Sequence, residues 1–449
     1  MSQVEKPGYK ETEAGGIPSD WLDCKLGNLV VKVGSGVTPK GGSESYLASG
    51  VPLIRSQNVQ RGSLSLSDVA YISADQHQRM ANSALRPLDV LLNITGASIG
   101  RCAVLPEDFG EGNVNQHVCI IRPADSLLPG FLSQYLNSQF GQGQINKLQA
   151  GGNREGLNYQ QIRGFSIGLP PLLEQQKIAA VLTAVDDKLD VIARQIEATQ
   201  TLKRGLMQTL FSRGVGTQDA DGRWVPHAEF KDSELGEIPA TWVPTTLGAV
   251  CDGALQTGPF GSQLHADEYQ DEGVPVLMPK DLVGCRAKLA TAARISPTRA
   301  EELSKHKVVA GDLLFSRRGD VARFALIDEE SEGALCGTGC LKARPSATHS
   351  SAFLAQLLQL DVVRAWLEQN AVGQTMPNMN TGILSSLPLV VPVDRREQDE
   401  IARILDSIDS KLQVLAVKQS HFAKLKRGLM QKLLTGEWRV SLDASAAGT

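Results

Sequence analysis

Two long stretches of the chain carry apolar residues at a spacing of seven. Each stretch has two parallel seams of this kind, repeated for about five heptads, which is typical of a helix that pairs with another helix. At about 1.5 Å per residue, a helix of about 40 residues makes a rod of roughly 60 Å. The seam residues are Ile178, Val185, Ile192 and Leu206 with Leu182, Leu189, Ile196 and Leu210 in the first stretch, and Ile401, Ile408, Leu415, Phe422 and Leu429 with Leu405, Leu412 and Leu433 in the second.

Polar residues interrupt both seams. Thr199 and Lys203 break the first stretch, and Gln419 and Lys426 break the second. Because the chain has only two such stretches, the simplest arrangement is that the two helices pair with each other. An antiparallel pair places the segments that precede the helices at opposite ends of the rod. A parallel pair would require residues 214–240 to run back along the rod, which their length permits but nothing favours, so we predict the antiparallel arrangement.

The ends of the two helices are nearly the same sequence. Leu202-Lys-Arg-Gly-Leu-Met-Gln-Thr-Leu-Phe211 recurs 223 residues later as Leu425-Lys-Arg-Gly-Leu-Met-Gln-Lys-Leu-Leu434, with eight of ten positions identical. The segments before the helices also match, beginning with Ile17-Pro-Ser-Asp-Trp21 and Ile238-Pro-Ala-Thr-Trp242 and continuing through the same order of apolar strands and polar loops. The chain is therefore predicted to be a tandem duplication, in which each copy holds a mixed α/β domain and a helix.

These patterns predict an α+β fold with two similar mixed α/β domains, held apart by a long antiparallel two-helix coiled coil. A pseudo-twofold axis is expected to relate the two copies. The predicted segments are a flexible N-terminus (1–14), a first domain (15–169), a first helix (170–213), a linker (214–234), a second domain (235–392), a second helix (393–436) and a C-terminal tail (437–449).

Composition narrows the class of protein only a little. The chain is 42% hydrophobic and 21% charged, with a net charge of −4 and a pI of about 6.0. Nucleic-acid-binding domains usually show a basic surface, so any DNA contact has to rest on local patches. The seven cysteines are scattered and odd in number, which favours reduced thiols in the cytoplasm. Cys336 and Cys340 lack partners at zinc spacing and are interpreted as buried thiols.

Two similar domains with different loops, held at a fixed separation, suit a linear target with two parts. Double-stranded DNA is the obvious candidate, because half-site spacing then becomes a geometric property of the protein. For any single polar loop residue, solvation is the simpler interpretation, and the set is stronger than its members. The side chains predicted to contact phosphates and base edges are Lys40, Arg55, Gln57, Asn58, Arg61, Thr95, Ser98, Arg101, Asn115, Gln116, Asn153 and Arg154 in the first domain, and Lys280, Arg286, Arg317, Arg318, Arg323, Gln374, Asn378 and Asn380 in the second.

Several motifs together resemble the specificity subunits of type I restriction-modification systems. The most specific is Leu425-Lys-Arg-Gly-Leu-Met-Gln-Lys-Leu-Leu-Thr-Gly-Glu-Trp-Arg-Val440, and further ones are Leu169-Pro-Pro-Leu-Leu-Glu-Gln-Gln176, Thr95-Gly-Ala-Ser-Ile-Gly-Arg101 and Gly258-Pro-Phe-Gly-Ser262. The resemblance covers nearly the whole chain. It implies that the two domains are target-recognition domains, each reading one part of a bipartite, asymmetric DNA sequence, with the helices as an antiparallel spacer.

The resemblance also implies partners. Two modification subunits would bind S-adenosylmethionine and methylate adenine, and restriction subunits would use ATP and Mg²⁺ to translocate and cleave DNA. The chain itself has no Asn/Asp-Pro-Pro-aromatic motif, no phosphate-binding glycine loop and no histidine ligand pattern. We therefore predict a non-catalytic cytoplasmic subunit without a cofactor, metal site, signal peptide or membrane span.

Two glycines inside the predicted helices call for an explanation. Gly205 and Gly428 each cost about 1 kcal/mol relative to alanine at such positions. A close backbone approach, to the other helix or to a partner, would account for both, and inheritance without selection for packing is the alternative. The residues predicted to serve helix packing or partner docking are Gly205, Leu206, Met207, Gly428, Leu429 and Met430.

Two other classes of function stay open at this point. In a protein-interaction scaffold, the rod would act as a dimeriser and the domains would bind proteins or peptides. The net charge of −4 favours a scaffold slightly, whereas the loop chemistry counts against it. Salt dependence separates the two, because each phosphate contact contributes about one log unit to the slope of binding against salt. An enzyme with an unrecognised site is the third possibility.

Overall fold

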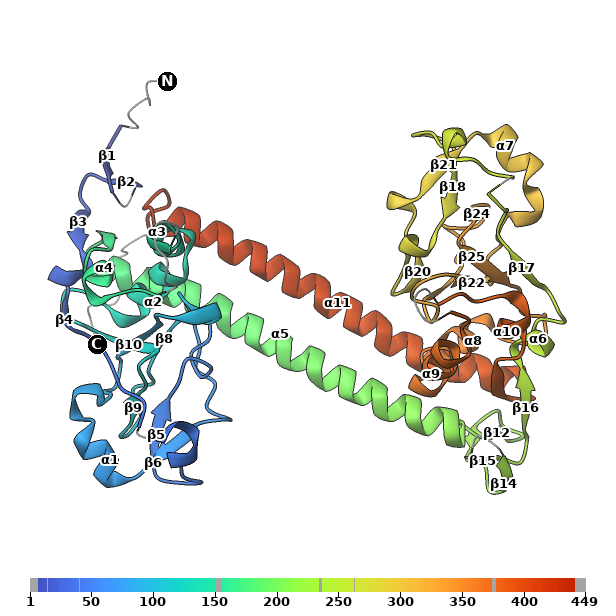
Figure 1. Ribbon diagram of the computed structural model, residues 1–449, viewed down its shortest axis with the longest axis horizontal. Helices are drawn as coiled ribbons and strands as arrows, with labels where there is room; N and C mark the ends of the chain where they lie inside the picture. Colours follow the sequence, from blue (N-terminus) through green and yellow to red (C-terminus); the bar gives the residue numbers. More distant parts are fainter. Residues whose placement is uncertain are drawn as a thin grey trace. The chain divides into compact units, whose positions relative to one another are not determined.

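The chain forms two compact units (Figure 1). The computed structural model describes residues 7–13, 15–39, 41–149, 156–233, 236–261, 263–373 and 377–440. Unit 1 comprises Met1–Gln195 with Leu415–Thr449, and unit 2 comprises Ile196–Val414. Each unit therefore combines one mixed domain with one part of each long helix, because α5 (Leu172–Arg213) and α11 (Arg395–Leu433) both pass from one unit into the other.

The domain of unit 1 is built on two small sheets. The larger sheet is antiparallel, with the order β4 (Val30–Ser35), β10 (Val118–Pro123), β7 (Val90–Asn93), β8 (Cys102–Val104). In the smaller sheet, β5 (Val51–Ile54) pairs antiparallel with β6 (Ala70–Ile72) and parallel with β9 (Asn113–Val114). Two further pairs are β1 (Tyr9–Thr12) with β2 (Gly15–Pro18), and β3 (Leu22–Lys25) with β11 (Ser166–Leu169). The helices are α1 (Ala74–Arg79), α2 (Pro129–Asn137), α3 (Gln139–Gln149) and α4 (Tyr159–Arg163).

The domain of unit 2 repeats this plan. Its larger sheet has the order β17 (Leu255–Thr257), β25 (Cys340–Ala343), β22 (Leu313–Ser316), β23 (Phe324–Leu326), β20 (Cys285–Ala287), β19 (Leu282–Val283). In the smaller sheet, β18 (Val274–Leu277) pairs antiparallel with β21 (Ala293–Ile295) and parallel with β24 (Leu335–Cys336). β16 (Trp242–Thr246) pairs with β26 (Pro388–Pro392). The helices are α6 (Leu247–Val250), α7 (Pro297–Glu302), α8 (Ser351–Leu357), α9 (Asp361–Asn370) and α10 (Thr381–Ser385).

The shared topology confirms the predicted duplication of a mixed α/β domain. The duplication extends to the anchoring tryptophans, both of which are fully buried. The indole N–H of Trp21 donates to Glu174 at 3.1 Å, and that of Trp242 donates to Glu397 at 3.0 Å. Each glutamate lies in the first turn of a long helix. The matching tryptophan and proline turns thus tie each domain to the start of the helix that follows it.

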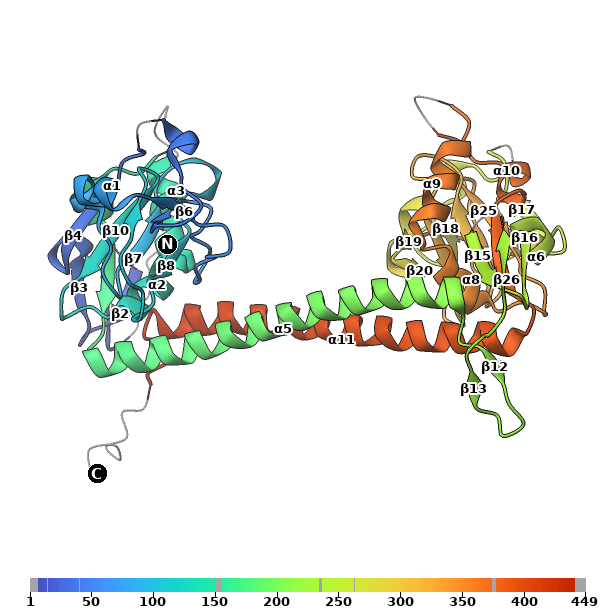
Figure 2. The ribbon, with the colours of Figure 1, turned by 90° about the horizontal axis from the view of Figure 1, so that it is seen from below.

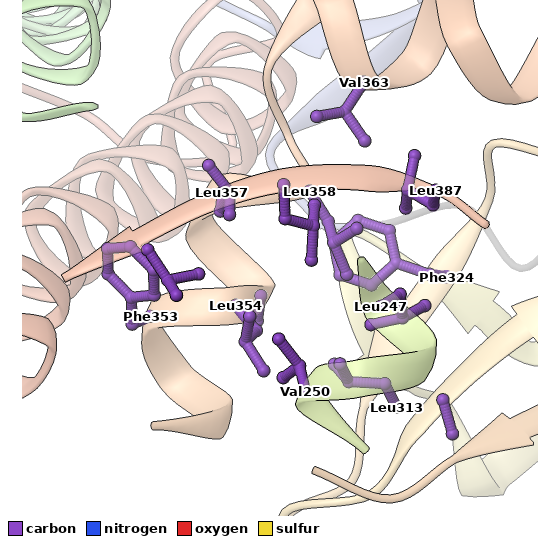
Figure 3. Packing of buried hydrophobic residues seen from close by; sticks show 14 of the residues in the cluster. Leu247, Val250, Leu313, Phe324, Phe353, Leu354, Leu357, Leu358, Val363 and Leu387 are labelled. Carbon is purple, nitrogen blue, oxygen red and sulfur yellow. The ribbon is translucent and has the colours of Figure 1, made fainter. Parts of the chain in front are cut away.

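The core of unit 2 lies between its larger sheet and helix α8 (Figure 3). Leu313 and Phe324 come from β22 and β23, and Phe353 and Leu354 come from α8. The same cluster includes Leu405 of α11, so the long helix shares the core of the domain. Apolar burial of this kind provides most of the stabilisation of such a unit.

Within each unit, the parts of α5 and α11 lie side by side and antiparallel (Figures 1 and 2). In unit 1, Ile178 of α5 belongs to the same buried cluster as Leu433 of α11. In unit 2, Leu210 of α5 shares a cluster with Ile401 of α11. The beginning of each helix therefore meets the end of the other, which confirms the antiparallel pairing predicted from the heptads.

The lysines that interrupt the heptad seams form a duplicated ion pair between the helices. Lys203 of α5 lies 2.7 Å from Asp409 of α11, and Lys426 of α11 lies 2.5 Å from Asp186 of α5. A glutamine from the adjacent domain helix also donates to each aspartate. A polar pair within an apolar seam is a known device for fixing the register of two helices, and we assign that role to these pairs.

The structure corrects one explanation of the helix glycines. Gly205 and Gly428 are exposed, and a Cβ at either position would meet no atom within 4 Å. Neither glycine therefore permits a close approach of the two helices. Leu206 and Met207 instead pack against the core of unit 2. Leu429 and Met430 pack in the core of unit 1.

Three predicted irregular segments contain ordered structure. Within the predicted linker 214–234, β12 (Thr217–Gln218) pairs with β13 (Trp224–Val225), and β14 (Phe230–Ser233) pairs with β15 (Gly236–Pro239) of the second domain. Part of the predicted flexible N-terminus forms β1. In the predicted tail, Arg439 forms ion pairs with Glu174 and Asp20 at 2.8 Å each. The composition of these segments is polar, but their partners come from distant parts of the chain.

Candidate nucleic-acid interface

Loops from three strands of unit 1 meet at one edge of its domain. The buried side chain of Asn93, at the end of β7, donates to the carbonyl of Ser56 at 2.8 Å and to the hydroxyl of Ser98 at 3.1 Å. The amide of Asn115 donates to the carbonyl of Ile54 at 3.1 Å. Loops 55–58, 95–101 and 115–117 therefore lie next to one another. We call this set the unit 1 rim.

Eight of the predicted contact residues lie on the unit 1 rim, and five of them come from loops 95–101 and 115–117. Thr95 shares a hydrogen bond of 2.6 Å with His117, whose ring also lies 3.2 Å from the amide of Gln116. Arg101 donates to the side chain of Gln60 at 3.0 Å, which joins the rim to the next loop. The members of the set are Thr95, Ser98, Arg101, Asn115 and Gln116.

The other predicted residues of unit 1 differ in what their side chains do. Asn58 is 1% exposed, and its amide donates to the carbonyls of Ser65 and Asp68, so it shapes its own loop. Arg55 pairs with Asp68 at 3.6 Å, and Gln57 also donates to that carboxylate. Arg61 is exposed. The remaining predicted residues, Lys40, Asn153 and Arg154, lie outside the described residues.

Unit 2 has a rim of the same construction. The amide of Arg317 donates to the carbonyl of Gly339, and the carbonyl of Arg317 accepts from the amide of Met379, both at 2.8 Å. The amide of Gly337 donates to the carbonyl of Leu277 at 2.9 Å. Loops 278–281, 317–323, 337–339 and 377–380 therefore adjoin, and we call them the unit 2 rim.

The unit 2 rim carries most of the basic residues predicted for this unit. Lys280 and Arg318 are exposed on it, and Arg318 forms a backbone bridge with Asn378. Arg323 donates to the carbonyl of Pro279 at 3.2 Å and so spans two of its loops. Asn380 caps α10 by accepting from the amide of Ile383, which is a structural role.

Two predicted residues of unit 2 do not fall on its described rim. Arg286 lines a cavity of about 670 Å³ together with Gln356 of α8 and Asp406 of α11. That cavity is lined by residues of α8 and α11 and by none of the rim loops 317–323 and 337–339. Gln374 lies outside the described part of the chain.

Aromatic residues of both rims escaped the sequence-based prediction. His117 belongs to the hydrogen-bonded set of unit 1, Tyr159 is 42% exposed at the start of α4, and Phe260 is 56% exposed in the loop after β17. The one available signal was the phenylalanine between two glycines in Gly258-Pro-Phe-Gly-Ser262. Residue type alone favoured the polar neighbours as DNA contacts, because base edges are recognised mostly by hydrogen-bonding side chains.

The cysteines near the unit 2 rim are buried thiols, as predicted. Cys336 and Cys340 are 1% and 0% exposed, and all seven cysteines are free. Burial raises the pKa of Cys336 to about 12, so the thiol stays protonated at neutral pH. Among the residues that the structure describes, no group of three His, Cys, Asp or Glu side chains could hold a metal ion. No helix in that part of the chain is long and apolar enough to cross a membrane.

Comparison with known proteins gives a consistent result. A family model described as "Type I restriction modification DNA specificity domain" matches twice, over residues 18–200 and 239–420. The putative type I restriction enzyme MjaX specificity subunit of Methanocaldococcus jannaschii is 26% identical over 97% of this chain and 98% of its own length. The EcoKI specificity subunit of Escherichia coli is 21% identical over 96% of this chain and 91% of its own.

A solved structure shares the fold. The S subunit of a type I restriction-modification system from M. genitalium superimposes with a TM-score of 0.59 at 15% sequence identity. The match covers 92% of this chain and 96% of that chain. The fold of this chain is therefore a known one.

Proposed function

Because this chain belongs to the family of type I restriction-modification DNA specificity proteins, we infer that it is the DNA-recognition subunit of a type I restriction-modification complex. The observation that carries this inference is the pair of rims, one in each matched domain, which share their construction and differ in their side chains. The scaffold alternative is not favoured, because both matched domains are DNA specificity domains.

Each rim reads one half of a bipartite DNA target in this proposal. On the unit 2 rim, Arg317 and Arg318 supply guanidinium groups, which suit phosphates and the paired acceptors of guanine. On the unit 1 rim, Thr95, Gln116 and His117 supply hydroxyl, amide and imidazole hydrogen-bonding groups, which suit the edges of several bases. The differing chemistry of the two rims explains why the two half-sites would differ in sequence.

The remaining activities of the complex belong to partner subunits in this proposal. Two modification subunits would bind S-adenosylmethionine and methylate adenine at N6, and restriction subunits would use ATP and Mg²⁺. This chain would contribute no catalytic residue and would act in the cytoplasm. Extrusion of the target adenine from the duplex is a general requirement for chemistry on a base, so the rims have to tolerate a distorted half-site.

The exposed side of the repeated helix motif is the proposed docking site for the modification subunits. Gly205 and Gly428 face open space, and Leu202 and Leu425 next to them are 50% and 49% exposed. An outward glycine beside an exposed leucine has no use in the isolated chain. Both features would permit the close approach of a partner, once at each copy of the motif.

Larger side chains at these glycines are expected to block assembly. The double variant Gly205→Met and Gly428→Met should fold, since both positions are exposed and a Cβ at either would meet no atom within 4 Å, but recovery of modification subunits by the tagged chain should fall about tenfold. The matched control is Ala193→Met with Ala416→Met, at exposed positions of the same helices. Equal recovery with both double variants would contradict this docking site.

The decisive experiment for the function is to co-express the chain with its modification subunits and map N6-methyladenine in host DNA. We expect a bipartite motif with a fixed gap. The double variant Arg317→Ala and Arg318→Ala should lose specificity in one half of the motif only, because each lost bidentate contact removes about 1–3 kcal/mol of discrimination. Arg223→Ala with Lys231→Ala, exposed but away from the rim, is the control. Methylation without any consensus would contradict base reading, and failure to form a complex would favour a scaffold.

A further inference from the structure

Each rim presents one exposed aromatic ring. Among the described residues, Tyr159, Phe260 and Trp438 are the only exposed aromatic side chains of the phenylalanine, tyrosine and tryptophan type, at 42%, 56% and 55%. Tyr159 lies at the unit 1 rim and Phe260 at the unit 2 rim. Since other aromatic side chains are mostly withdrawn from solvent, the position of these two calls for an explanation in terms of the rims.

The loop that carries Phe260 is a fixed turn. The amide of Phe260 donates to the side chain of Gln263 at 3.0 Å, and its carbonyl accepts from the amide of Gln263 at 2.7 Å. The amide of Leu264, a buried residue, donates to the same carbonyl at 3.2 Å. The neighbouring Pro259 is buried. The ring is therefore held outward by an ordered backbone.

The same loop adjoins the basic part of the unit 2 rim. The amide of Gly258 donates to the carbonyl of Cys340 at 3.0 Å, and Gly258 packs directly on the carbonyl of Gly337. The amide of Arg317 donates to the carbonyl of Gly339, which lies between Gly337 and Cys340 in the chain. The exposed ring and the guanidinium groups thus belong to one surface.

Unit 1 reaches the same arrangement by a different route. The hydroxyl of Tyr159 accepts from the amide of Ser35 at 3.0 Å and lies 2.5 Å from the hydroxyl of that serine. Ser35 ends β4, the strand that corresponds to β17 before Phe260. Close by in the chain, Gly156 forms a backbone bridge with Thr95 of the rim. An aromatic ring therefore lies beside the equivalent loop in both units, although it comes from different segments.

We propose that Phe260 inserts its ring at a base step of the half-site read by unit 2, and that Tyr159 makes the corresponding stacking contact for unit 1. This proposal rests on the DNA-recognition function proposed above. Apolar side chains inserted between base pairs unstack and kink DNA, and exposed rings stack on bases of any sequence. Insertion would stabilise the local unstacking that accompanies extrusion of an adenine by a modification subunit. The surrounding arginines would hold the phosphates of the same segment.

The test uses the complete complex with modification subunits and a duplex in which 2-aminopurine replaces the target adenine of one half-site. The half-sites are assigned to the units by the Arg317 and Arg318 variants. Two duplexes, each labelled in a different half-site, are compared, and wild-type complex should raise the 2-aminopurine fluorescence of both. Phe260→Ala should remove most of the rise in the unit 2 half-site, leave the other half-site unchanged and weaken binding about tenfold. Phe260→Trp should retain the rise.

Further variants separate insertion from other roles of the ring. Tyr159→Ala should lower the fluorescence rise in the unit 1 half-site. Tyr159→Phe loses the hydrogen bond to Ser35 but keeps a ring, so it separates the loss of this bond from the loss of the ring. A Phe260→Ala complex with wild-type fluorescence and affinity would overturn the proposal. If replacing thymine by deoxyuridine in the DNA reproduces the effect of Phe260→Ala, the ring contacts a thymine methyl group and insertion is wrong. If the wild-type complex binds no specific sequence, the proposed function itself fails.

Discussion

Replacing Glu397 with alanine is expected to lower the free energy of unfolding of unit 2 by about 3–5 kcal/mol, because it removes the partner of several buried polar groups. Glu397 is 2% exposed. Its carboxylate accepts from the indole of Trp242 at 3.0 Å and from the amides of Val215 and Gly216 at 3.1 and 3.2 Å. It also lies 2.8 Å from the ring of His227. The variant removes this acceptor from the buried indole N–H, the two amides and the His227 ring.

Denaturant unfolding of the full chain, followed by tryptophan fluorescence, measures this loss. Glu400→Ala on the same helix is the matched control, since Glu400 pairs with the exposed Arg403 one turn away and such pairs contribute little. Glu397→Gln keeps one acceptor oxygen and should fall between the two. A loss for Glu397→Ala no larger than that for Glu400→Ala would mean that this buried carboxylate does not hold the segment after α5 to the domain.

Replacing Gly258 with alanine is expected to disrupt the unit 2 rim and abolish recognition of its half-site. A Cβ at this position would lie 1.8 Å from the carbonyl oxygen of Gly337, and backbone cannot yield as a flexible side chain can. Overpacking of this kind costs about 1–3 kcal/mol. It would also displace loop 337–339, which supports Arg317. Because several base contacts would be lost together, specificity for that half-site should fall more than about 100-fold.

The control for this variant lies three residues away. At Gly261 a Cβ would meet no atom within 4 Å, so Gly261→Ala should leave folding and the methylation motif unchanged. Gly36→Ala is the counterpart in unit 1, where the Cβ would lie 1.6 Å from the carbonyl oxygen of Val114. Methylation mapping should show each glycine variant losing a different half of the motif. Loss of the same half in both would contradict the assignment of one unit to one half-site.

Which side chains of the rims are free to contact DNA could not be read from residue type. Asn58 and Asn380 have the chemistry of base-reading residues, but one clamps its own loop and the other caps a helix. Conversely, the aromatic Phe260 and Tyr159 are exposed beside the basic and amide side chains that the sequence indicated. A hydrogen-bonding side chain serves the partner that the fold brings nearest, and that partner is often far away in the chain.

The sequence by itself determined the duplication, the two long helices and the mixed α/β character of the domains. These features follow from local, periodic patterns, because a helix or strand buries the face on which its own apolar residues lie. Its repeated motifs also indicated the family.

Only the tertiary structure decided the use of the residues that break those patterns. Lys203 and Lys426 interrupt an apolar seam in the sequence, yet each meets an aspartate of the other helix. Gly205 and Gly428 face outward, away from the helix pairing that could have explained them. The predicted linker is ordered because Glu397, buried far along the chain, accepts from its backbone. The apolar pattern of an element's own sequence indicates which of its faces is buried. The energy of a buried polar group depends instead on one specific partner, and only the folding of the whole chain brings that partner close.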